Sequence, residues 1–119
     1  MVVAYLLAIF ASSSRSDISI PGGMSDKTAH GLAYSGLSAV VVWARVDGDW
    51  RRIRLRTVIL ATVLATGYGL TDEFHQLFVP RRSFDWFDLL ADAAGAFVAA
   101  SAVWAWGILF RWRKRLYGV

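Results

Sequence analysis

Residues 72–92 contain the densest group of side chains in this chain that could perform chemistry. Carboxylates in such a group can act as general bases, and arginines bind anionic groups through several charge-assisted hydrogen bonds. An apolar run ends just before the stretch and another begins just after it. Polar groups at such a boundary are costly unless they are paired or solvated, so their position first indicates a functional site. The polar members are Asp72, Glu73, His75, Gln76, Arg81, Arg82, Asp85, Asp88 and Asp92.

A second polar group lies at residues 26–30, where an earlier apolar run begins. In a helix, Asp26 and His30 lie four residues apart on one face, and Lys27 and Tyr34 lie on the same stripe as His30. The same helical spacing relates the pairs Asp72–Gln76, Glu73–Gln76 and Asp88–Asp92. If these faces point into one bundle, the sequence predicts that carboxylates, an imidazole and basic groups meet in one cleft.

Simpler structural roles could explain several of these residues. Asp26 and Asp85 stand near helix starts, where acids cap the helix and favour its dipole. Asp88 can complete a capping box begun by Asp85, and His30 can be a packed histidine bonded to Asp26. Asp92 is harder to explain, because an unpaired charge so far inside a membrane helix costs about 2.5–3.5 kcal/mol. Its candidate partners are Arg82, Lys27 and His30.

Covalent and metal-dependent chemistry have little support in the sequence. The chain has no cysteine and no G-x-S-x-G nucleophile motif. Glu73 and His75 are two residues apart, so a helix directs them differently, and no H-E-x-x-H motif is present. We therefore predict neither a metal nor a cofactor. If a reaction is catalysed, His30 or Glu73 is the candidate general base. Lys27 or Arg82 would then stabilise the developing negative charge.

Composition indicates that the helices carrying these residues lie in a membrane. Of the 119 residues, 56% are hydrophobic, and the mean hydropathy is +0.44. Both values are high for a small soluble domain. We predict an all-α integral membrane bundle of four antiparallel transmembrane helices, forming one domain over residues 1–119. The predicted helices are residues 2–14, 27–44, 57–76 and 86–110.

The first predicted helix is short, and the connections around the others carry clear signals. A helix of residues 1–14 is about 21 Å long, less than the roughly 30 Å hydrocarbon core. We expect it to be tilted or to lack upstream residues. A loop of residues 12–25 follows. Candidate N-caps are Ser25 or Asp26 for the second helix and Ser83 or Asp85 for the fourth. Small residues that allow close helix contact are Gly31, Ala33, Ser35, Gly36, Ser38, Gly95, Ala96, Ala99 and Ala100.

The positions of the basic residues predict the orientation. The loop of residues 45–56 and the tail after residue 110 hold nine of the 13 basic residues. Basic residues beside membrane helices remain in the cytoplasm. We therefore predict that both termini are cytoplasmic and that the polar cluster lies on the outer face. Nucleic acid is not an expected partner, because no soluble basic face is present.

The chain resembles the VanZ-like family of small bacterial membrane proteins over nearly its whole length. The resemblance rests on the motifs Asp26-Lys27-x-x-His30, Glu73-x-x-Gln76 and Pro80-x-Arg82, followed by Asp88 and Gly95. Three positions depart from the family pattern: Arg81 and Ala99 replace usual glycines, and Asp92 replaces a frequent asparagine. The family is named for a protein associated with resistance to teicoplanin, a glycopeptide antibiotic that acts outside the cell. The resemblance therefore implies a role in the bacterial cytoplasmic membrane and cell envelope.

Three functions of different classes fit these observations. The first is binding of a lipid-linked or cell-wall-related molecule, or a phospholipid head group, at the outer leaflet, with a link to glycopeptide resistance implied by the resemblance. The second is a membrane-embedded hydrolase or transferase, and the third is a structural accessory role. We favour binding and leave enzymatic activity and oligomeric state open. The predicted ligand-binding residues are Asp26, Lys27, His30, Glu73, Gln76, Arg82, Asp88 and Asp92.

Overall fold

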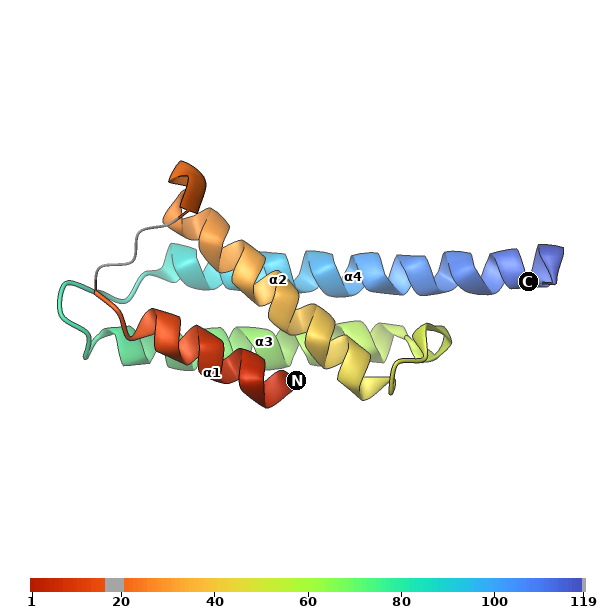
Figure 1. Cartoon of the computed structure of the whole chain (residues 1–119), viewed down its shortest axis with the longest axis horizontal. Helices are drawn as coiled ribbons and strands as arrows, with labels where there is room; N and C mark the ends of the chain where they lie inside the picture. The colour runs from red at the N-terminus through yellow and green to blue at the C-terminus, as the bar shows by residue number, and fades with distance from the viewer. Residues whose placement is uncertain (17–20, 119) are drawn as a thin grey trace.

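The computed structural model describes residues 1–16 and 21–118, which form four α-helices and no strand (Figure 1). The helices are α1 (Val2–Ser13), α2 (Asp26–Arg45), α3 (Leu55–Gln76) and α4 (Trp86–Tyr117). Short 3-10 turns occur at Pro21–Gly23 and Trp50–Arg52. The loop predicted for residues 12–25 lies partly outside the described residues, and its first positions belong to α1.

Side-chain hydrogen bonds define where two of the helices begin. The Ser25 hydroxyl accepts a hydrogen bond from the backbone N–H of Thr28 at 3.2 Å and caps α2. The Asp85 carboxylate accepts from the backbone N–H of Phe87 at 2.8 Å and caps α4. Of the candidate N-caps predicted from the sequence, Ser25 and not Asp26 caps α2, and Asp85 and not Ser83 caps α4.

Helix α4 is longer than predicted, because the basic tail continues it to Tyr117 instead of leaving it at residue 110. Arginine, lysine and leucine are good helix formers, and a change from apolar to basic side chains does not interrupt backbone hydrogen bonding. The guanidinium of Arg111 also donates to the carbonyl of Arg51 at 2.8 Å and ties the tail to the second connection. Gly118 ends the helix with φ 67°, a left-handed conformation that glycine adopts readily.

Successive helices run in alternating directions (Figure 1). Helix α2 crosses α4 obliquely and packs against it more extensively than any other pair of helices does, while α3 lies alongside α4. As a result, the C-terminal ends of α1 and α3 and the N-terminal ends of α2 and α4 gather at one end of the bundle. We call this region the polar end, because both polar groups of the sequence lie there.

Small residues let α2 and α4 approach closely, as predicted. A Cβ atom added to Gly95 would overlap with the backbone carbonyl of Gly31. The hydroxyl of Ser35 is shared between the carbonyls of Gly31 at 2.7 Å and Gly95 at 3.0 Å. The hydroxyl of Ser38 donates to the carbonyl of Ala96 at 2.8 Å. These contacts enclose the side chains of α4 that face α2.

Two tyrosines hold α1 against the other helices. The Tyr5 hydroxyl donates to the carbonyl of Ala33 on α2 at 2.8 Å, and its ring occupies the space that a side chain at Gly36 would need. The Tyr68 hydroxyl of α3 donates to the carbonyl of Leu6 at 2.7 Å. Helix α1 therefore contacts both α2 and α3.

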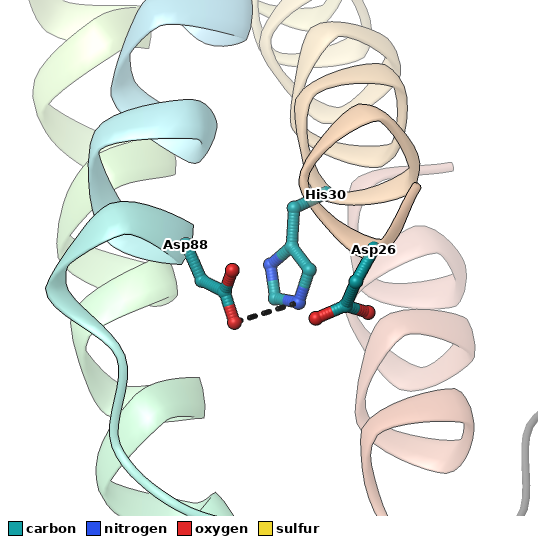
Figure 2. A group of neighbouring side chains, drawn as sticks. All are labelled: Asp26, His30 and Asp88. Carbon is teal, nitrogen blue, oxygen red and sulfur yellow. Dashed lines mark ion pairs between the residues drawn. The ribbon is translucent and has the colours of Figure 1, made fainter. Parts of the chain in front are cut away.

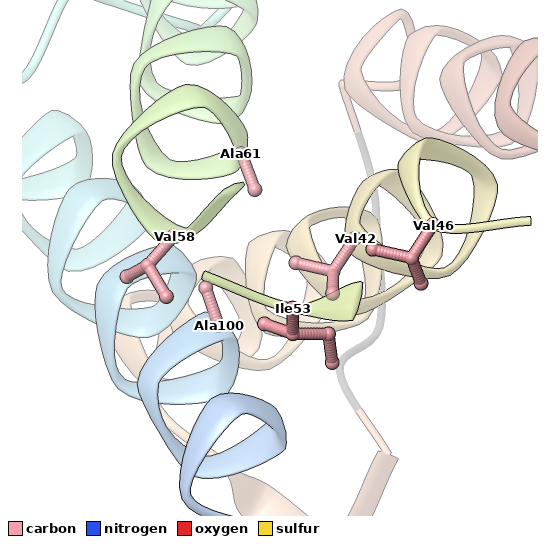
Figure 3. Close-up of a cluster of buried hydrophobic side chains, with 6 residues drawn as sticks. All are labelled: Val42, Val46, Ile53, Val58, Ala61 and Ala100. Carbon is pink, nitrogen blue, oxygen red and sulfur yellow. The ribbon is translucent and has the colours of Figure 1, made fainter. Parts of the chain in front are cut away.

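Two clusters of apolar side chains form the core. One lies away from the polar end, where α2, α3, α4 and the second connection meet (Figure 3); it contains Val42, Val46, Ile53, Val58, Ala61 and Ala100. The other lies nearer the polar end and contains Ile9, Tyr34, Leu37, Ala65 and Ala96. Several members are small, so close backbone approach contributes much of the packing.

Besides its apolar core, this bundle buries several acids and exposes many large apolar side chains, which is unusual for a soluble domain. The acids Asp72, Glu73, Asp88 and Asp92 are buried inside it. Large apolar side chains are exposed on all four helices, including Leu7, Leu32, Ile59, Val63, Phe97 and Leu109. Within the described residues, one helix, Trp86–Tyr117, is long and apolar enough by itself to cross a membrane, and Val2–Ser13 is apolar but shorter.

Candidate functional site

Lys27 joins the start of α2 to the start of α4 at the polar end. Its ammonium donates to Asp85 Oδ2 at 2.9 Å and to Asp88 Oδ1 at 2.8 Å. The hydrogen bond from Lys27 holds the pKa of Asp85 below its usual range, so this carboxylate stays ionised down to acidic pH. Asp85 is therefore both the cap of α4 and an ion-pair partner of α2.

His30 lies one turn further along α2, between acids of two helices. Its Nδ1 lies 2.9 Å from Asp92 Oδ1, and its Nε2 lies 3.8 Å from Asp88 Oδ2. Figure 2 shows the imidazole between Asp88 and Asp26, with the longer contact to Asp88 dashed. The side chain of His30 is 10% exposed and that of Asp92 is 0% exposed. Asp92 is thus paired with one of its three predicted partners, and His30 is bonded to Asp92 instead of Asp26.

Glu73 of α3 takes part in capping α4. Its Oε2 accepts a hydrogen bond from the backbone N–H of Asp85 at 3.0 Å. In a capping box this N–H would bond to the side chain three residues later, Asp88. Asp88 instead accepts from Lys27, so the predicted Asp85–Asp88 box is replaced by a contact from a neighbouring helix. Lys27, His30, Glu73, Asp88 and Asp92 form what we call the interhelix network.

Three buried oxygen atoms in or beside the interhelix network have no hydrogen-bond partner among the described residues. They are Glu73 Oε1, Asp92 Oδ2 and the Tyr34 hydroxyl. Buried carboxylate oxygens normally accept hydrogen bonds or bind a cation. Three network residues each offer one atom that could bind a metal ion, and these atoms all lie within 4.8 Å of one another; the residues are His30, Glu73 and Asp92. A second group with the same spacing is Asp26, His30 and Asp88. Local spacing relates only Asp26 and His30, which both lie on α2; the remaining members of the two groups come from other helices.

A cavity of about 600 Å³ lies beside His30, bordered by α1, α2, α3 and the connection before α4. Its apolar walls include Tyr5, Ile9 and Ala33, and Arg81 and Arg82 line it on the side of the connection. The other polar residues that line it are Ser12, Ser13, Ser16, Asp26, His30, Tyr34, Asp72 and Gln76. The cavity is therefore lined by both apolar and polar side chains, and the polar ones include two arginines.

The predicted site residues divide into two neighbouring groups instead of sharing one cleft. Asp26, His30, Gln76 and Arg82 line the cavity, whereas Lys27, Glu73, Asp88 and Asp92 do not. The acids of α4, Asp88 and Asp92, are buried against α2, whereas no residue of α4 lines the cavity. His30 belongs to both groups and connects them.

The sequence pattern did not indicate the contribution of α1 to the cavity. Ser12 and Ser13 fell where the predicted first helix and the predicted loop overlapped; they belong to the last turn of α1, and the amide of Gln76 lies 3.4 Å from the Ser13 hydroxyl. Serines near the end of an otherwise apolar helix were the available signal. His75 lies in the polar stretch of residues 72–92, but it contacts the Ser14 hydroxyl at 3.0 Å and belongs to neither the cavity lining nor the interhelix network.

The profile of the VanZ/LLP1 family matches residues 3–111. The chain belongs to the VanZ/LLP1 family. Membership confirms the resemblance, and the match covers the cavity and the whole interhelix network. At the position where the family usually has glycine, Arg81 has φ 61°, in the left-handed region that favours glycine. This turn therefore retains a glycine-like conformation with a different residue.

A relative outside bacteria extends the VanZ/LLP1 comparison. "Uncharacterized protein C11E3.10" of Schizosaccharomyces pombe is 32% identical over 80 residues. The aligned part covers 67% of this chain and 47% of the relative, so this chain spans about half the length of the relative. No solved structure matches the chain.

Proposed function

We propose that this VanZ/LLP1 protein is a multi-pass membrane protein that binds the anionic head group of a lipid in the cavity at its polar end. The observation that carries the proposal is a cavity with apolar walls and two arginines, in a bundle whose outer surface is apolar. In this role the protein is a binding component of the cell envelope and not an enzyme.

The outward-facing side chains support a membrane position for all four helices. Helices α2 and α3 have 20 and 22 residues. At 1.5 Å per residue they are about 30 Å and 33 Å long, close to the thickness of the hydrocarbon core. Their acids lie at helix ends or inside the bundle, whereas Leu32, Ile59 and Val63 face outward. Charged residues that face the bundle interior are the arrangement expected in lipid.

The basic residues support the orientation. Nine of the 13 lie either in residues 45–56, which span the second connection and the adjoining helix ends, or in the last turns of α4, away from the polar end. Placing these residues in the cytoplasm puts both termini inside and opens the cavity toward the outer leaflet.

The chemistry of the cavity favours an amphipathic anion. A guanidinium has five N–H donors and binds phosphate oxygens in pairs. Arg82 uses Nε and Nη2 to bond the carbonyl of Arg15, at 3.3 and 3.1 Å, so its remaining donors are available to a ligand. Tyr5, Ile9 and Ala33 would contact the first carbons of an acyl or prenyl chain. Serine hydroxyls between these two regions suit the ester oxygens of a head group.

The fungal relative favours a ligand that bacteria and fungi both make, such as a phospholipid, over a bacterial wall precursor. A polyprenyl-phosphate precursor would present the same phosphate and an apolar chain. The two sources differ in consequence, because only a wall precursor would connect this protein to teicoplanin resistance.

The proposal can be tested by native mass spectrometry of the full chain purified from membranes. We expect it to retain an anionic lipid and to select phosphatidylglycerol or a polyprenyl phosphate over phosphatidylcholine when offered each. Arg82→Gln should reduce retention at least tenfold, because a charged hydrogen bond contributes about 1.5–3 kcal/mol and about 1.4 kcal/mol already corresponds to tenfold. Arg113→Gln, in the last turns of α4, is the matched control and should retain lipid normally. Equal retention by Arg82→Gln and the wild type, or no lipid at all, would leave the structural accessory role as the better account.

A second candidate function is acid–base catalysis, favoured by the His30–Asp92 contact at the cavity wall. A carboxylate that orients one imidazole nitrogen leaves the other available as a general base or acid. Under this alternative, His30→Gln abolishes hydrolysis of a bound lipid phosphate but leaves its retention unchanged. A wild-type protein that retains lipid without converting it over hours would eliminate the catalytic reading.

A further inference from the structure

We propose that His30, Glu73 and Asp92 bind one divalent transition-metal ion between α2, α3 and α4. The sequence pattern predicted no metal, and lipid binding in the cavity neither requires nor supplies one. The proposal therefore stands independently of the proposed function.

The first observation is the convergence of suitable donors. One imidazole nitrogen and two carboxylate oxygens, from three different helices, lie within 4.8 Å of one another. Donors that share an ion at about 2.0–2.2 Å lie at most about 4.4 Å apart, so small side-chain rotations would close the site. Because each donor comes from a different packed helix, the fold itself brings them together.

The second, independent observation is the state of the two acids. Glu73 and Asp92 are both 0% exposed, and each has one carboxylate oxygen without a hydrogen-bond partner among the described residues. An ionised buried carboxylate is costly unless it is fully paired. Glu73 Oε2 and Asp92 Oδ1 are already bonded, to the Asp85 backbone and to His30. Their second oxygens are the ones that a cation would satisfy.

Charge balance at this position also favours a cation. Lys27 is bonded to Asp85 and Asp88 and does not bond to Glu73 or Asp92. Among the described side chains, His30 contacts Asp92 directly, and no cationic side chain forms an ion pair with Glu73. A divalent ion would neutralise both carboxylates.

The alternative group of Asp26, His30 and Asp88 fits a metal less well. Asp26 is exposed and can be solvated, and Asp88 already accepts a hydrogen bond from Lys27.

Glycine at position 69 leaves room for the side chain of Asp92 in the proposed site, since a Cβ there would lie 2.7 Å from Asp92 Oδ2. Mixed imidazole and carboxylate donors suit Zn²⁺ or Mn²⁺ better than Ca²⁺ or Mg²⁺, which prefer oxygen ligands alone.

Titration of the full chain in nanodiscs with Zn²⁺, followed by calorimetry and thermal unfolding, tests the proposal. We expect one ion per chain and a higher unfolding temperature with the ion bound. Glu73→Gln and Asp92→Asn should each weaken Zn²⁺ binding at least tenfold. Asp26→Asn distinguishes the proposed site from the alternative group of Asp26, His30 and Asp88. Asp49→Asn, in the second connection, is a control for the loss of a negative charge elsewhere. Both variants should bind Zn²⁺ as tightly as the wild type.

A measurement on Mn²⁺ keeps the test decisive if the acid variants do not fold. The chain has two histidines, so pulsed electron paramagnetic resonance of bound Mn²⁺ should detect one imidazole nitrogen. That coupling should persist in His75→Gln and disappear in His30→Gln. The proposal is overturned if the wild type binds neither ion, if no histidine nitrogen couples to Mn²⁺, or if Asp26→Asn loses the ion and Glu73→Gln keeps it.

Discussion

At the scale of single residues, Arg81 combines a strained backbone with a side chain that lines the cavity. A φ of 61° costs a non-glycine residue about 1–2 kcal/mol in the folded state. Glycine avoids this cost, but its greater freedom in the unfolded chain lowers stability by about 0.5–1 kcal/mol. We expect Arg81→Gly to stabilise the fold by up to about 1 kcal/mol and, at the same time, to weaken retention of anionic lipid. Thermal unfolding in detergent and native mass spectrometry measure the two effects. Arg82→Gln is the comparison: it should lose lipid without gaining stability, and parallel changes in both variants would contradict this reading.

The ion pair of Asp85 with Lys27 gives stability a defined dependence on pH. The pKa of Asp85 is lower in the folded state than in the unfolded state, where it is near 3.8. The ion pair therefore stabilises the fold fully above the unfolded-state pKa, and this stabilisation disappears as the pH falls through the folded-state pKa. Asp85→Asn keeps a side chain that can cap α4 and removes the charge. We expect the wild type to unfold at a higher temperature than Asp85→Asn at pH 6, with the gap closing below about pH 4. A gap that stays constant as the pH falls from 6 through the acidic range would assign the difference to the cap instead of the ion pair.

Residue types and helical spacing were enough to predict which side chains gather at the polar end, but not how they pair. Asp92 was recognised as needing a partner because of its depth in α4, and His30 is that partner. The bond from Glu73 to the Asp85 backbone could not be foreseen, because it joins residues whose proximity depends on how α3 meets α4. Pairing of this kind depends on helix rotation, which hydropathy does not specify.

At the scale of helices, the ends followed from local signals and the contacts from small residues. Ser25 and Asp85 cap their helices because their side chains bond to free backbone N–H groups, and these positions are visible in the sequence. The end of α4 was misplaced, since polarity changes near residue 110 but helix propensity does not. Glycine and serine positions correctly indicated the faces of α2 and α4 that touch.

The contact between α2 and α4 can be tested at Gly95. A methyl group there would overlap with the Gly31 carbonyl, which is backbone and cannot move aside. We expect Gly95→Ala to destabilise the bundle by about 1–3 kcal/mol, the usual cost of overpacking. Gly67→Ala is the matched control, because Gly67 is exposed on α3 with no atom near an added Cβ. Gly67→Ala should instead stabilise the bundle by about 0.5–1 kcal/mol. Equal effects at the two glycines would show that the close approach of α2 and α4 at Gly95 is not important for stability.

At the scale of the whole molecule, exposed apolar helix faces and buried acids make sense together if lipid replaces water as the main solvent. In water, a surface with Leu32, Val63 and Phe97 exposed would favour aggregation. In lipid, the same surface is solvated, and polar groups are placed inside or at the ends. The 32-residue α4, about 48 Å long by the helical rise, exceeds the hydrocarbon thickness. Its basic last turns would then project into the cytoplasm.

The proposed orientation makes a direct prediction for cysteine labelling, since the chain has no cysteine of its own. Ser83 is exposed in the connection at the polar end, and Arg52 is exposed in the second connection near the opposite end of the bundle. In intact cells, Ser83→Cys should react with a membrane-impermeant maleimide, whereas Arg52→Cys should react only after lysis. The difference follows from keeping nine of 13 basic residues on the cytoplasmic side. Reaction of Arg52→Cys from outside, with Ser83→Cys protected, would invert the bundle and place the cavity toward the cytoplasm. Equal labelling of both before lysis would contradict a single fixed orientation of the bundle.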